Sequence, residues 1–196
     1  MILGVVLAGG ASRRMGSDKA MVEVAGRSML ERVAAATSDV ADQVVVAGRD
    51  GNLSGFRGIP DQVDGPVGPL AGLSAALAEA ELIGAGAVLL VAVDQPFVRR
   101  ATLQCLIDEF DGRAVVPESD GVRQVTCALY PAAWQEEAAA ELAAGGSVQT
   151  LLDRMPVRKV TPETWRSWGE DGRSWFSVDD TTALEQGLER YGSVFE

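Results

Sequence analysis

The sequence contains no histidine and only two cysteines, Cys105 and Cys127. Without histidine, the chain lacks the commonest general base, the Ser-His and Cys-His pairs that activate nucleophiles, and a main ligand of zinc and iron. The two cysteines have no CxxC spacing, so we expect two reduced, partly buried thiols rather than a disulfide or a metal site. Chemistry in this protein therefore depends on carboxylates, lysine, arginine, backbone amides and a metal that prefers oxygen ligands.

Basic residues and long apolar runs are also scarce. The chain has 17 Lys and Arg against 28 Asp and Glu, a net charge of -11, which argues against nucleic acid as a partner because that binding needs clustered cations. A small anion can still bind where a few cations gather. The longest apolar run, near residues 85–93, is short of the roughly 20 residues of a membrane span, and the apolar N-terminus lacks the basic region of a signal peptide. We therefore expect a cytoplasmic protein that does not enter a membrane.

Apolar β-branched segments alternate with Ala- and Leu-rich stretches along most of the chain, a pattern typical of parallel strands joined by crossover helices. The expected strands cover residues 2–8, 43–47, 87–93 and 113–117, with 124–130 as a further candidate. The expected helices cover residues 28–37, 70–80, 101–110, 131–143 and 181–191, with a short one at 148–154. We predict an α/β fold, a single domain over residues 1–196 with a Rossmann-like, mainly parallel sheet and helices on both faces.

The strongest local feature is the segment LAGGASRRMGSDK at residues 7–19, directly after the first expected strand. Ligands of open α/β sheets bind beyond the carboxyl ends of the strands, and Gly9 and Gly10 let backbone amides approach an anion closely. Arg14 and Lys19 bring two positive charges to the same segment. A glycine turn followed by solvated basic residues is the alternative, but strand, glycines and cations together favour a phosphate-binding loop. The segment matches neither GxxxxGK[ST] nor GxGxxG.

Acidic residues follow two further segments. Asp94 lies at the tip of the strand expected at 87–93, and a carboxylate there, together with phosphate oxygens, is a natural ligand of Mg²⁺. An aspartate that only ends the strand before Pro96 is the simpler alternative. Of the pair Asp179 and Asp180, one is expected to cap the last helix. The other is a candidate second ligand of the metal.

Asp61 and the turn GPVGPLAG at residues 65–72 precede the helix expected at 70–80. Glycines in this turn leave room for a flat nucleotide base. By itself the turn is weak evidence, because glycine and proline mark tight turns of many kinds.

Taken together, these segments resemble those of the molybdenum cofactor guanylyltransferase (MobA) family. LAGGASRRMGSDKA at residues 7–20 is similar to the family signature LAGGxSxRMGxDK, and GPLAGL at 68–73 and VDQP at 93–96 match its next two motifs in order. SVDDTTAL at residues 177–184 resembles a degenerate form of the family's NVNTPEDL segment. The resemblance spans the whole chain. It implies a fold of the nucleotide-diphospho-sugar transferase type, and transfer of GMP from GTP to molybdopterin with release of pyrophosphate.

The resemblance also implies roles for individual residues. It places the nucleotide against Leu7, Ala8, Gly9, Gly10, Lys19, Asp61 and Asp94. Lys19 would contact the phosphates, Asp61 the nucleoside, and Asp94 the magnesium ion.

Three positions depart from the family pattern. The family often has Asn after the second strand, where this chain reads AGR at residues 47–49, so one base or ribose contact is in question. Asp179 stands where the family commonly has Asn, which keeps an oxygen ligand and adds charge. Thr182 replaces an acidic residue, a change we interpret as a detail of helix capping.

The implied reaction explains how the chain can lack histidine. The attacking group is the terminal phosphate of molybdopterin, and a phosphate monoester with a second pKa of about 6 is already largely dianionic at neutral pH. No general base is needed, so catalysis reduces to in-line positioning and neutralisation of charge by Mg²⁺, Lys19 and Arg14. The expected partners are GTP and molybdopterin, with other cofactor-biosynthesis proteins and molybdoenzymes as further candidates. Arg123 and Gln124 are candidates for pterin contacts from their position only, with a solvated hairpin as the alternative.

Two other functions stay open. A cytidylyltransferase acting on the same pterin or on another phosphorylated small molecule shares this fold and loop, although that family usually reads LAAG where this chain has LAGG, and lacks GPLAGL. A nucleotide-binding scaffold without turnover is the other alternative. The presence of Lys19 and Asp94 argues against it.

Overall fold

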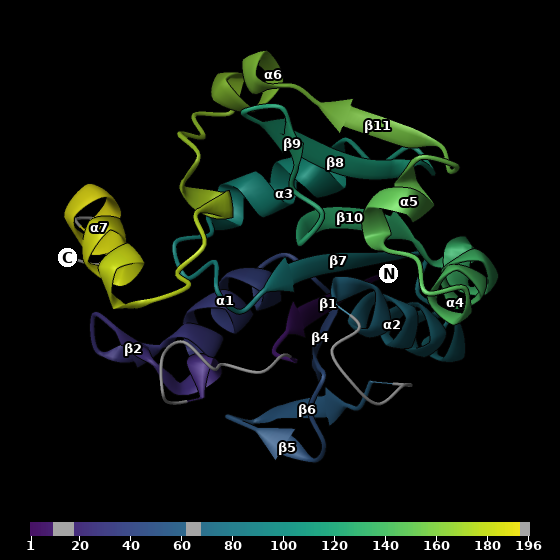
Figure 1. Cartoon of the computed structure of the whole chain (residues 1–196), viewed down its shortest axis with the longest axis horizontal. Helices are drawn as coiled ribbons and strands as arrows, with labels where there is room; N and C mark the ends of the chain where they lie inside the picture. The colour runs from purple at the N-terminus through teal and green to yellow at the C-terminus, as the bar shows by residue number, and fades with distance from the viewer. Residues whose placement is uncertain (10–17, 62–67, 193–196) are drawn as a thin grey trace.

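Strand β1 (Ile2–Leu7) lies in the middle of the sheet, between β4 (Gln43–Ala47) and β7 (Ala87–Ala92), and pairs in parallel with both (Figure 1). The computed structural model describes residues 1–9, 18–61 and 68–192 of the chain. β7 is buried along its whole length. Its sequence AVLLVA is apolar without alternation because both faces of a parallel sheet are covered.

Over the described residues, the main sheet has nine strands in the order β11-β8-β10-β7-β1-β4-β6-β5, with β9 paired to β8. β6 (Phe56–Ile59) extends the parallel set beyond β4, and β11 (Val157–Val160) pairs in parallel with β8 (Ala114–Ser119). The antiparallel members are β10 (Cys127–Pro131), β5 (Asn52–Leu53) and β9 (Val122–Arg123). The mainly parallel sheet predicted from the sequence is confirmed.

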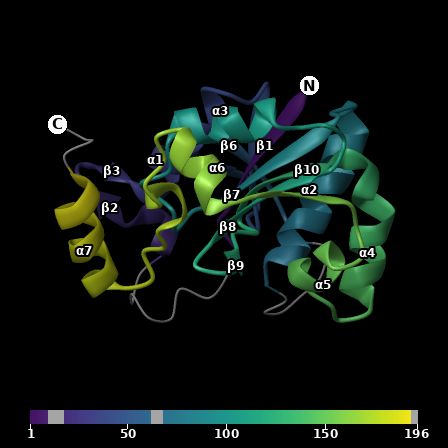
Figure 2. The ribbon, with the colours of Figure 1, turned by 90° about the horizontal axis from the view of Figure 1, so that it is seen from above.

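Helices cover both faces of this sheet (Figure 2). One face carries α1 (Met29–Ser38), α3 (Arg100–Asp108) and α6 (Pro162–Ser167). The other carries α2 (Pro69–Ile83), α4 (Gln135–Ala143) and α5 (Val148–Leu152). In the part of the chain that the structure describes, no helix combines the length and the apolar composition needed to cross a bilayer.

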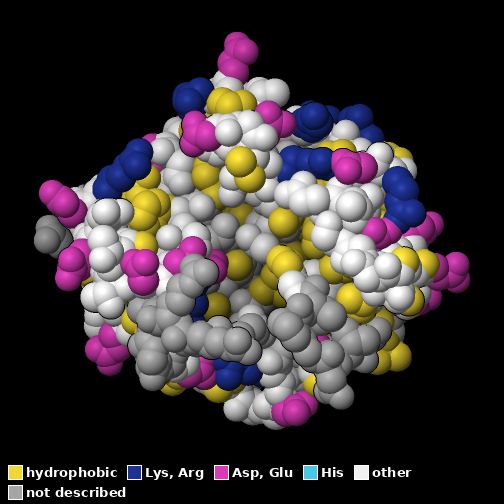
Figure 3. Space-filling model, viewed as in Figure 1, with side chains coloured by type: hydrophobic (Ala, Val, Ile, Leu, Met, Phe, Trp, Pro, Cys, Tyr) yellow, Lys and Arg dark blue, Asp and Glu magenta, His cyan; other side chains and the backbone are white. Residues whose placement is uncertain are grey.

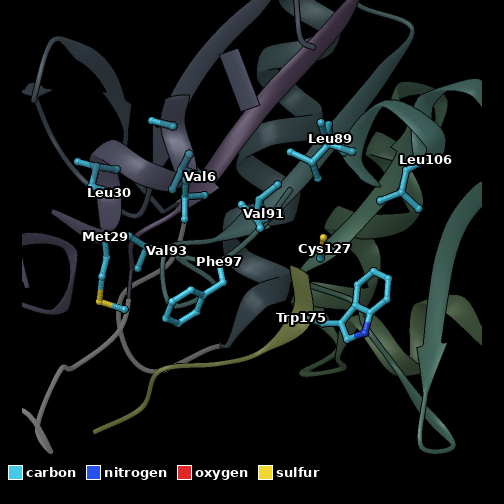
Figure 4. Packing of buried hydrophobic residues seen from close by; sticks show 14 of the residues in the cluster. Val6, Met29, Leu30, Leu89, Val91, Val93, Phe97, Leu106, Cys127 and Trp175 are labelled. Carbon is cyan, nitrogen blue, oxygen red and sulfur yellow. The ribbon is translucent and has the colours of Figure 1, made fainter. Parts of the chain in front are cut away.

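The two faces bury two separate hydrophobic cores. Successive residues of a strand point to opposite faces, so Val6 belongs to one core and its neighbour Val5 to the other. Figure 4 shows the core around Val6, where Val91 of β7 lies between Val6 of β1 and Cys127 of β10. The same core holds Cys127, whose pKa is raised by burial, while Cys105 on α3 is half-buried; both thiols are free, as predicted.

The helix starts follow from local sequence. Ser28 and Glu31 form a reciprocal capping box at the start of α1. Asp180 caps α7 (Thr181–Tyr191) by accepting a hydrogen bond of 2.8 Å from the Ala183 N–H, which is the role expected for one member of the Asp179-Asp180 pair. The remaining elements are short: the 3-10 turns η1 (Lys19–Met21), η2 (Ala132–Trp134) and η3 (Arg173–Trp175), and the hairpin of β2 (Glu23–Val24) and β3 (Arg27–Ser28).

Several segments differ from the sequence prediction. Pro131 was expected to begin a helix, but it ends β10, and α4 begins only at Gln135 after a 3-10 turn. The strands β6, β11 and the β2–β3 hairpin were not predicted. They are two to four residues long and partly exposed, so they lack the apolar run by which a strand is found.

A buried carboxylate ties the C-terminal segment to α3. The Glu170 side chain is 3% exposed. It accepts hydrogen bonds from the hydroxyls of Thr102 and Ser174 and from the backbone N–H groups of Asp171 and Gly172. These donors satisfy a buried charge that would otherwise be costly, and they fix the segment in place.

The same segment then crosses the end of β7. The Val178 N–H donates to the backbone carbonyl of Asp94 at 2.8 Å. This contact brings Asp179, the next residue, to the carboxyl edge of the sheet.

We predict that Glu170→Gln destabilises the protein, because the amide turns one acceptor oxygen into a donor that faces other donors. The free energy of unfolding, measured by urea denaturation, should fall by about 3 kcal/mol, as expected for the loss of buried, charge-assisted hydrogen bonds. Glu163→Gln on α6, where the side chain is exposed, is the matched control and should unfold like the parent. Equal losses in the two variants would contradict the role of Glu170.

Candidate active site

The carboxyl ends of β1, β4, β6 and β7 lie along one edge of the sheet. The Ala8 N–H donates to Ala47 O at 3.0 Å, and the Val93 N–H donates to Leu7 O at 2.9 Å, so the three central strands stay bonded up to this edge. The structure therefore brings together predicted site residues from separate parts of the chain, namely Leu7 at the end of β1 with Ala8 and Gly9 after it, Asp61 after β6, and Asp94 after β7. Gly10 and Arg14 were also predicted here, and they lie outside the described residues.

Lys19 lies between two carboxylates at this edge. Its Nζ is 3.1 Å from Asp94 Oδ2 and 2.7 Å from Asp179 Oδ1. The Asp94 side chain is 28% exposed and that of Asp179 is 56% exposed, so the trio opens toward solvent on the side of Asp179. Within this trio two negative charges face one positive charge, which leaves it able to attract a further cation.

The two carboxylates fit the magnesium ion that the family resemblance implies. They already hold a cation, the Lys19 ammonium, between them. Mg²⁺ prefers one or two protein carboxylates and takes its other oxygens from water and substrate phosphates. Asp94 and Asp179 supply that donor set.

Asp61 is half-buried, and its Oδ1 is a buried acceptor without a matching donor in the part of the chain that the structure describes. Its Oδ1 has no hydrogen-bond partner among the residues that the structure describes, and burial raises the pKa of the carboxyl group. A side chain at Gly9 would place its Cβ 3.2 Å from Asp61 Oδ2, and one at Gly72 would lie 3.8 Å from Oδ1. Buried acceptors normally have a partner, so Asp61 is ready to accept hydrogen bonds from a ligand.

Glycines allow the backbone segments around Asp61 to approach one another. Gly48 has a φ of 81°, and an added Cβ there would lie within 3.0 Å of Gly9 Cα, closer than real Cβ atoms come. A Cβ added at Gly72, in the first turn of α2, would likewise lie within 3.0 Å of the Leu7 side chain. Gly48 belongs to the stretch in which the family often has Asn, and here its backbone closes onto Gly9 instead of offering a side chain to the nucleotide.

Arg49 received no role from the sequence, yet it connects two parts of the site. Its Nε donates to Ala8 O at 2.9 Å, and its Nη2 donates to Asp18 Oδ1 at 2.5 Å. The only signal in the sequence is a charged residue just after a buried strand. Such a residue cannot be paired with Asp18, 31 positions away, without the fold.

Arg123 and Gln124 both have partners within the protein. The Arg123 guanidinium pairs with Asp153, which follows α5, at 2.5 Å, and Gln124 Nε2 donates to Val122 O at 3.2 Å. Arg123 ends the hairpin of β8 and β9, and a pterin contact of either residue stays a prediction.

Charges of both signs are spread over the surface. In Figure 3, acidic side chains lie around this face of the molecule and beside most of the basic ones. This distribution fits the net charge of -11.

Comparisons with known proteins test the family resemblance seen in the sequence. Residues 4–160 match the family model of the MobA-like NTP transferase domain. The chain is 37% identical over 131 residues to "Probable molybdenum cofactor guanylyltransferase" of Pelotomaculum thermopropionicum, a match that covers 65% of this chain and 62% of that protein. It is 35% identical over 148 residues to the molybdenum cofactor guanylyltransferase of Cereibacter sphaeroides, covering 74% and 76% of the two chains.

A solved structure extends the match to the fold. The chain is similar to molybdopterin-guanine dinucleotide biosynthesis protein A from Archaeoglobus fulgidus, with a TM-score of 0.81, 25% identity, and coverage of 97% of this chain and 99% of that one. The matched range, residues 4–160, contains the segment LAGGASRRMGSDK (the glycine motif, residues 7–19), Asp61 and Asp94, and Asp179 lies outside it. The chain belongs to the MobA-like NTP transferase family.

Proposed function

We propose that this protein transfers GMP from GTP to molybdopterin, giving molybdopterin guanine dinucleotide and pyrophosphate. The observation that carries the proposal is the trio of Lys19, Asp94 and Asp179 beside the glycine motif, in a chain whose relatives bear the name guanylyltransferase. Transfer from a triphosphate needs a cation for the phosphates and oxygen ligands for a metal, and this trio offers both. We further propose that residues 1–196 act as a single domain in the cytoplasm.

In the proposed reaction, an oxygen of the terminal phosphate of molybdopterin attacks the α-phosphorus of GTP. The bond from that phosphorus to the oxygen bridging the β-phosphate breaks, and pyrophosphate leaves with the electron pair. Since the attacking phosphate is already largely dianionic at neutral pH, the site needs no histidine to take a proton. The barrier is the repulsion between two anions, and the residues of this site act by positioning and neutralising them.

Each site residue has a proposed part in that task. Lys19 and Arg14 neutralise phosphate charge, and backbone groups of residues 7–10 hold the nucleotide. Asp94 and Asp179 hold Mg²⁺, which when bound neutralises phosphate charge and orients the triphosphate.

Asp61 is proposed to recognise the base. Guanine presents two adjacent donors, N1–H and its exocyclic amine, which suit a carboxylate that lacks donors. Cytosine presents an acceptor, N3, beside its amine and would leave the Asp61 carboxylate facing another acceptor. A site built for hydrogen bonds rejects a ligand that cannot make them, so this arrangement favours GTP over CTP.

With molybdopterin and Mg²⁺ present, we expect pyrophosphate release and dinucleotide formation with GTP to exceed those with CTP or ATP by about 100-fold or more. Pyrophosphate is measured by a coupled assay and the dinucleotide by chromatography. Equal rates with GTP and CTP would support the cytidylyltransferase alternative. Binding of GTP without pyrophosphate release would support the scaffold alternative.

Asp61→Asn should stabilise the protein and weaken its selectivity for GTP. Burial raises the pKa of Asp61, so the ionised carboxylate opposes folding at neutral pH, and asparagine removes that charge. The carboxyl group of the parent stabilises the fold below its ordinary pKa, and this contribution is lost as pH rises through the raised pKa. The stability advantage of the variant should therefore be greatest at neutral pH and shrink in acid.

Thermal unfolding of the parent and Asp61→Asn across this pH range, with kcat/KM for GTP and CTP, checks both parts. A variant that is less stable at neutral pH and equally selective for GTP would contradict the role of Asp61.

Asp94→Asn and Asp179→Asn should weaken the metal site unequally. Asp94 follows a central strand and is the less exposed of the two, so we expect its loss to reduce transfer by about 100-fold or more even at high Mg²⁺. Asp179→Asn keeps an amide oxygen and should mainly raise the Mg²⁺ concentration needed. The measurements are a Mg²⁺ titration of transfer and Mn²⁺ binding followed by electron paramagnetic resonance.

Lys19→Met completes this series. It removes the cation between the two carboxylates, so it should reduce transfer while strengthening Mn²⁺ binding in the absence of nucleotide. If Asp179→Asn proves as damaging as Asp94→Asn, the ranking of the ligands is wrong. If neither aspartate variant changes Mn²⁺ binding, the metal lies elsewhere.

A further inference from the structure

We propose that Arg49 is a positioning residue of this site. It fixes Ala8 and Asp18, which lie near the two ends of the glycine motif, relative to each other, and through Asp18 it sets the place of Lys19. The inference rests on the proposed function, since it concerns the residues that would hold the nucleotide. It assigns no contact between Arg49 and the substrate.

The backbone of Arg49 is held firmly at the carboxyl edge. It lies two residues after the end of β4, and the N–H groups of Gly48 and Arg49 both donate to Ile59 O of β6, at 2.9 and 3.4 Å. A Cβ at Gly58 would lie within 3.0 Å of the Arg49 carbonyl oxygen, so glycine is needed there for this close packing. The guanidinium group therefore extends from a rigid base.

One arm of the guanidinium reaches the first end of the motif. Nε donates to the carbonyl of Ala8, the residue directly after β1, at 2.9 Å. The Ala8 N–H is bonded to Ala47 O of β4 at the same time. Ala8 is thus held through its N–H by Ala47 of β4 and through its carbonyl by Arg49.

The other arm reaches the second end. Nη2 donates to Asp18 Oδ1 at 2.5 Å, and the same oxygen accepts a hydrogen bond from the Ala20 N–H at 3.2 Å, which caps η1. Lys19 is the first residue of η1, and its Nζ reaches Asp94 and Asp179. A shift of the Asp18 carboxylate would move the start of η1, and the Lys19 ammonium with it.

This bridge requires arginine. A planar guanidinium donates in two fixed directions from separate nitrogens, whereas a lysine ammonium is a single point of charge and cannot reach the Ala8 carbonyl and the Asp18 carboxylate with the same geometry. Holding both ends in place before the nucleotide arrives lowers the entropy that binding must remove.

The exposure of Arg49 and Asp18 to solvent distinguishes a role in positioning the site from a role in stabilising the fold. The Arg49 side chain is 29% exposed and that of Asp18 is 35% exposed. Ion pairs that are so accessible to water contribute little to overall stability. Loss of Arg49 should therefore appear in nucleotide binding and turnover rather than in unfolding.

The test uses Arg49→Ala, Arg49→Lys, Asp18→Asn and the double variant Arg49→Ala/Asp18→Asn. We expect Arg49→Ala to raise KM for GTP and to lower kcat, each by about tenfold, with a melting temperature close to that of the parent. Arg49→Lys should not restore either value. Asp18→Asn keeps an oxygen to cap η1 but weakens the pair, so it should show a loss of the same kind, and the double variant should be no worse than the worse single variant.

Arg57→Ala is the matched control. Arg57 lies on the neighbouring strand β6 and pairs with Glu79 of α2, away from the glycine motif. We expect this variant to keep the KM and kcat of the parent.

The outcomes are distinguishable. If the parent transfers GMP and Arg49→Ala does so equally well, the inference is overturned and the proposed function stands. If the losses in the double variant multiply, Arg49 acts independently of Asp18, and the positioning role is overturned. If the parent shows no transfer from GTP, the proposed function fails, and the affinity of the parent, Arg49→Ala and Asp18→Asn for Mg²⁺-GTP, measured by calorimetry, decides the inference.

Discussion

The close approach of backbone segments at the carboxyl edge of the sheet is the constraint on which the rest of the site depends. An added Cβ at Gly48 would collide with the backbone of Gly9, and one at Gly72 would force the side chain of Leu7 to move. This packing keeps the start of α2 against the end of β1 and buries Oδ1 of the half-buried Asp61. Oδ1 of Asp61, which has no partner among the described residues, is therefore a product of packing, because a larger residue at Gly48 would push the Gly9 backbone away from Asp61.

Charge in the site is assembled from three distant parts of the chain. Lys19 is the last residue of the glycine motif, and Asp94 follows β7. Asp179 belongs to a segment that is held by Glu170 and by the hydrogen bond from the Val178 N–H to the Asp94 carbonyl. The protein as a whole is strongly acidic. Its affinity for an anionic substrate thus depends on a few cations whose positions are set by hydrogen bonds, and not on the overall field of the protein.

The sequence predicted the parts of this structure that follow from local patterns. The central strands appear as apolar runs, α1 and α7 carry capping signals, and Lys19 and Asp94 stand beside glycines or at a strand end. Short strands such as β6 and β11 have no such pattern and gain their hydrogen bonds only from neighbours already in the sheet. The bridge from Arg49 to Asp18 and the donors around Glu170 depend on tertiary contacts, and the pattern of apolar residues along the sequence does not predict such contacts.

The separation of the two cores has a consequence for how members of such a family can vary in length. Val5 and Val6 are adjacent in β1 but belong to cores on opposite faces of the sheet. One residue inserted into or removed from β1 would send every following side chain of the strand to the wrong face and displace the glycine motif by one position. Surface loops elsewhere can gain or lose residues at little cost. The number of residues from β1 to the glycine motif is therefore expected to stay constant among such proteins, and insertions elsewhere in the chain can be located relative to it.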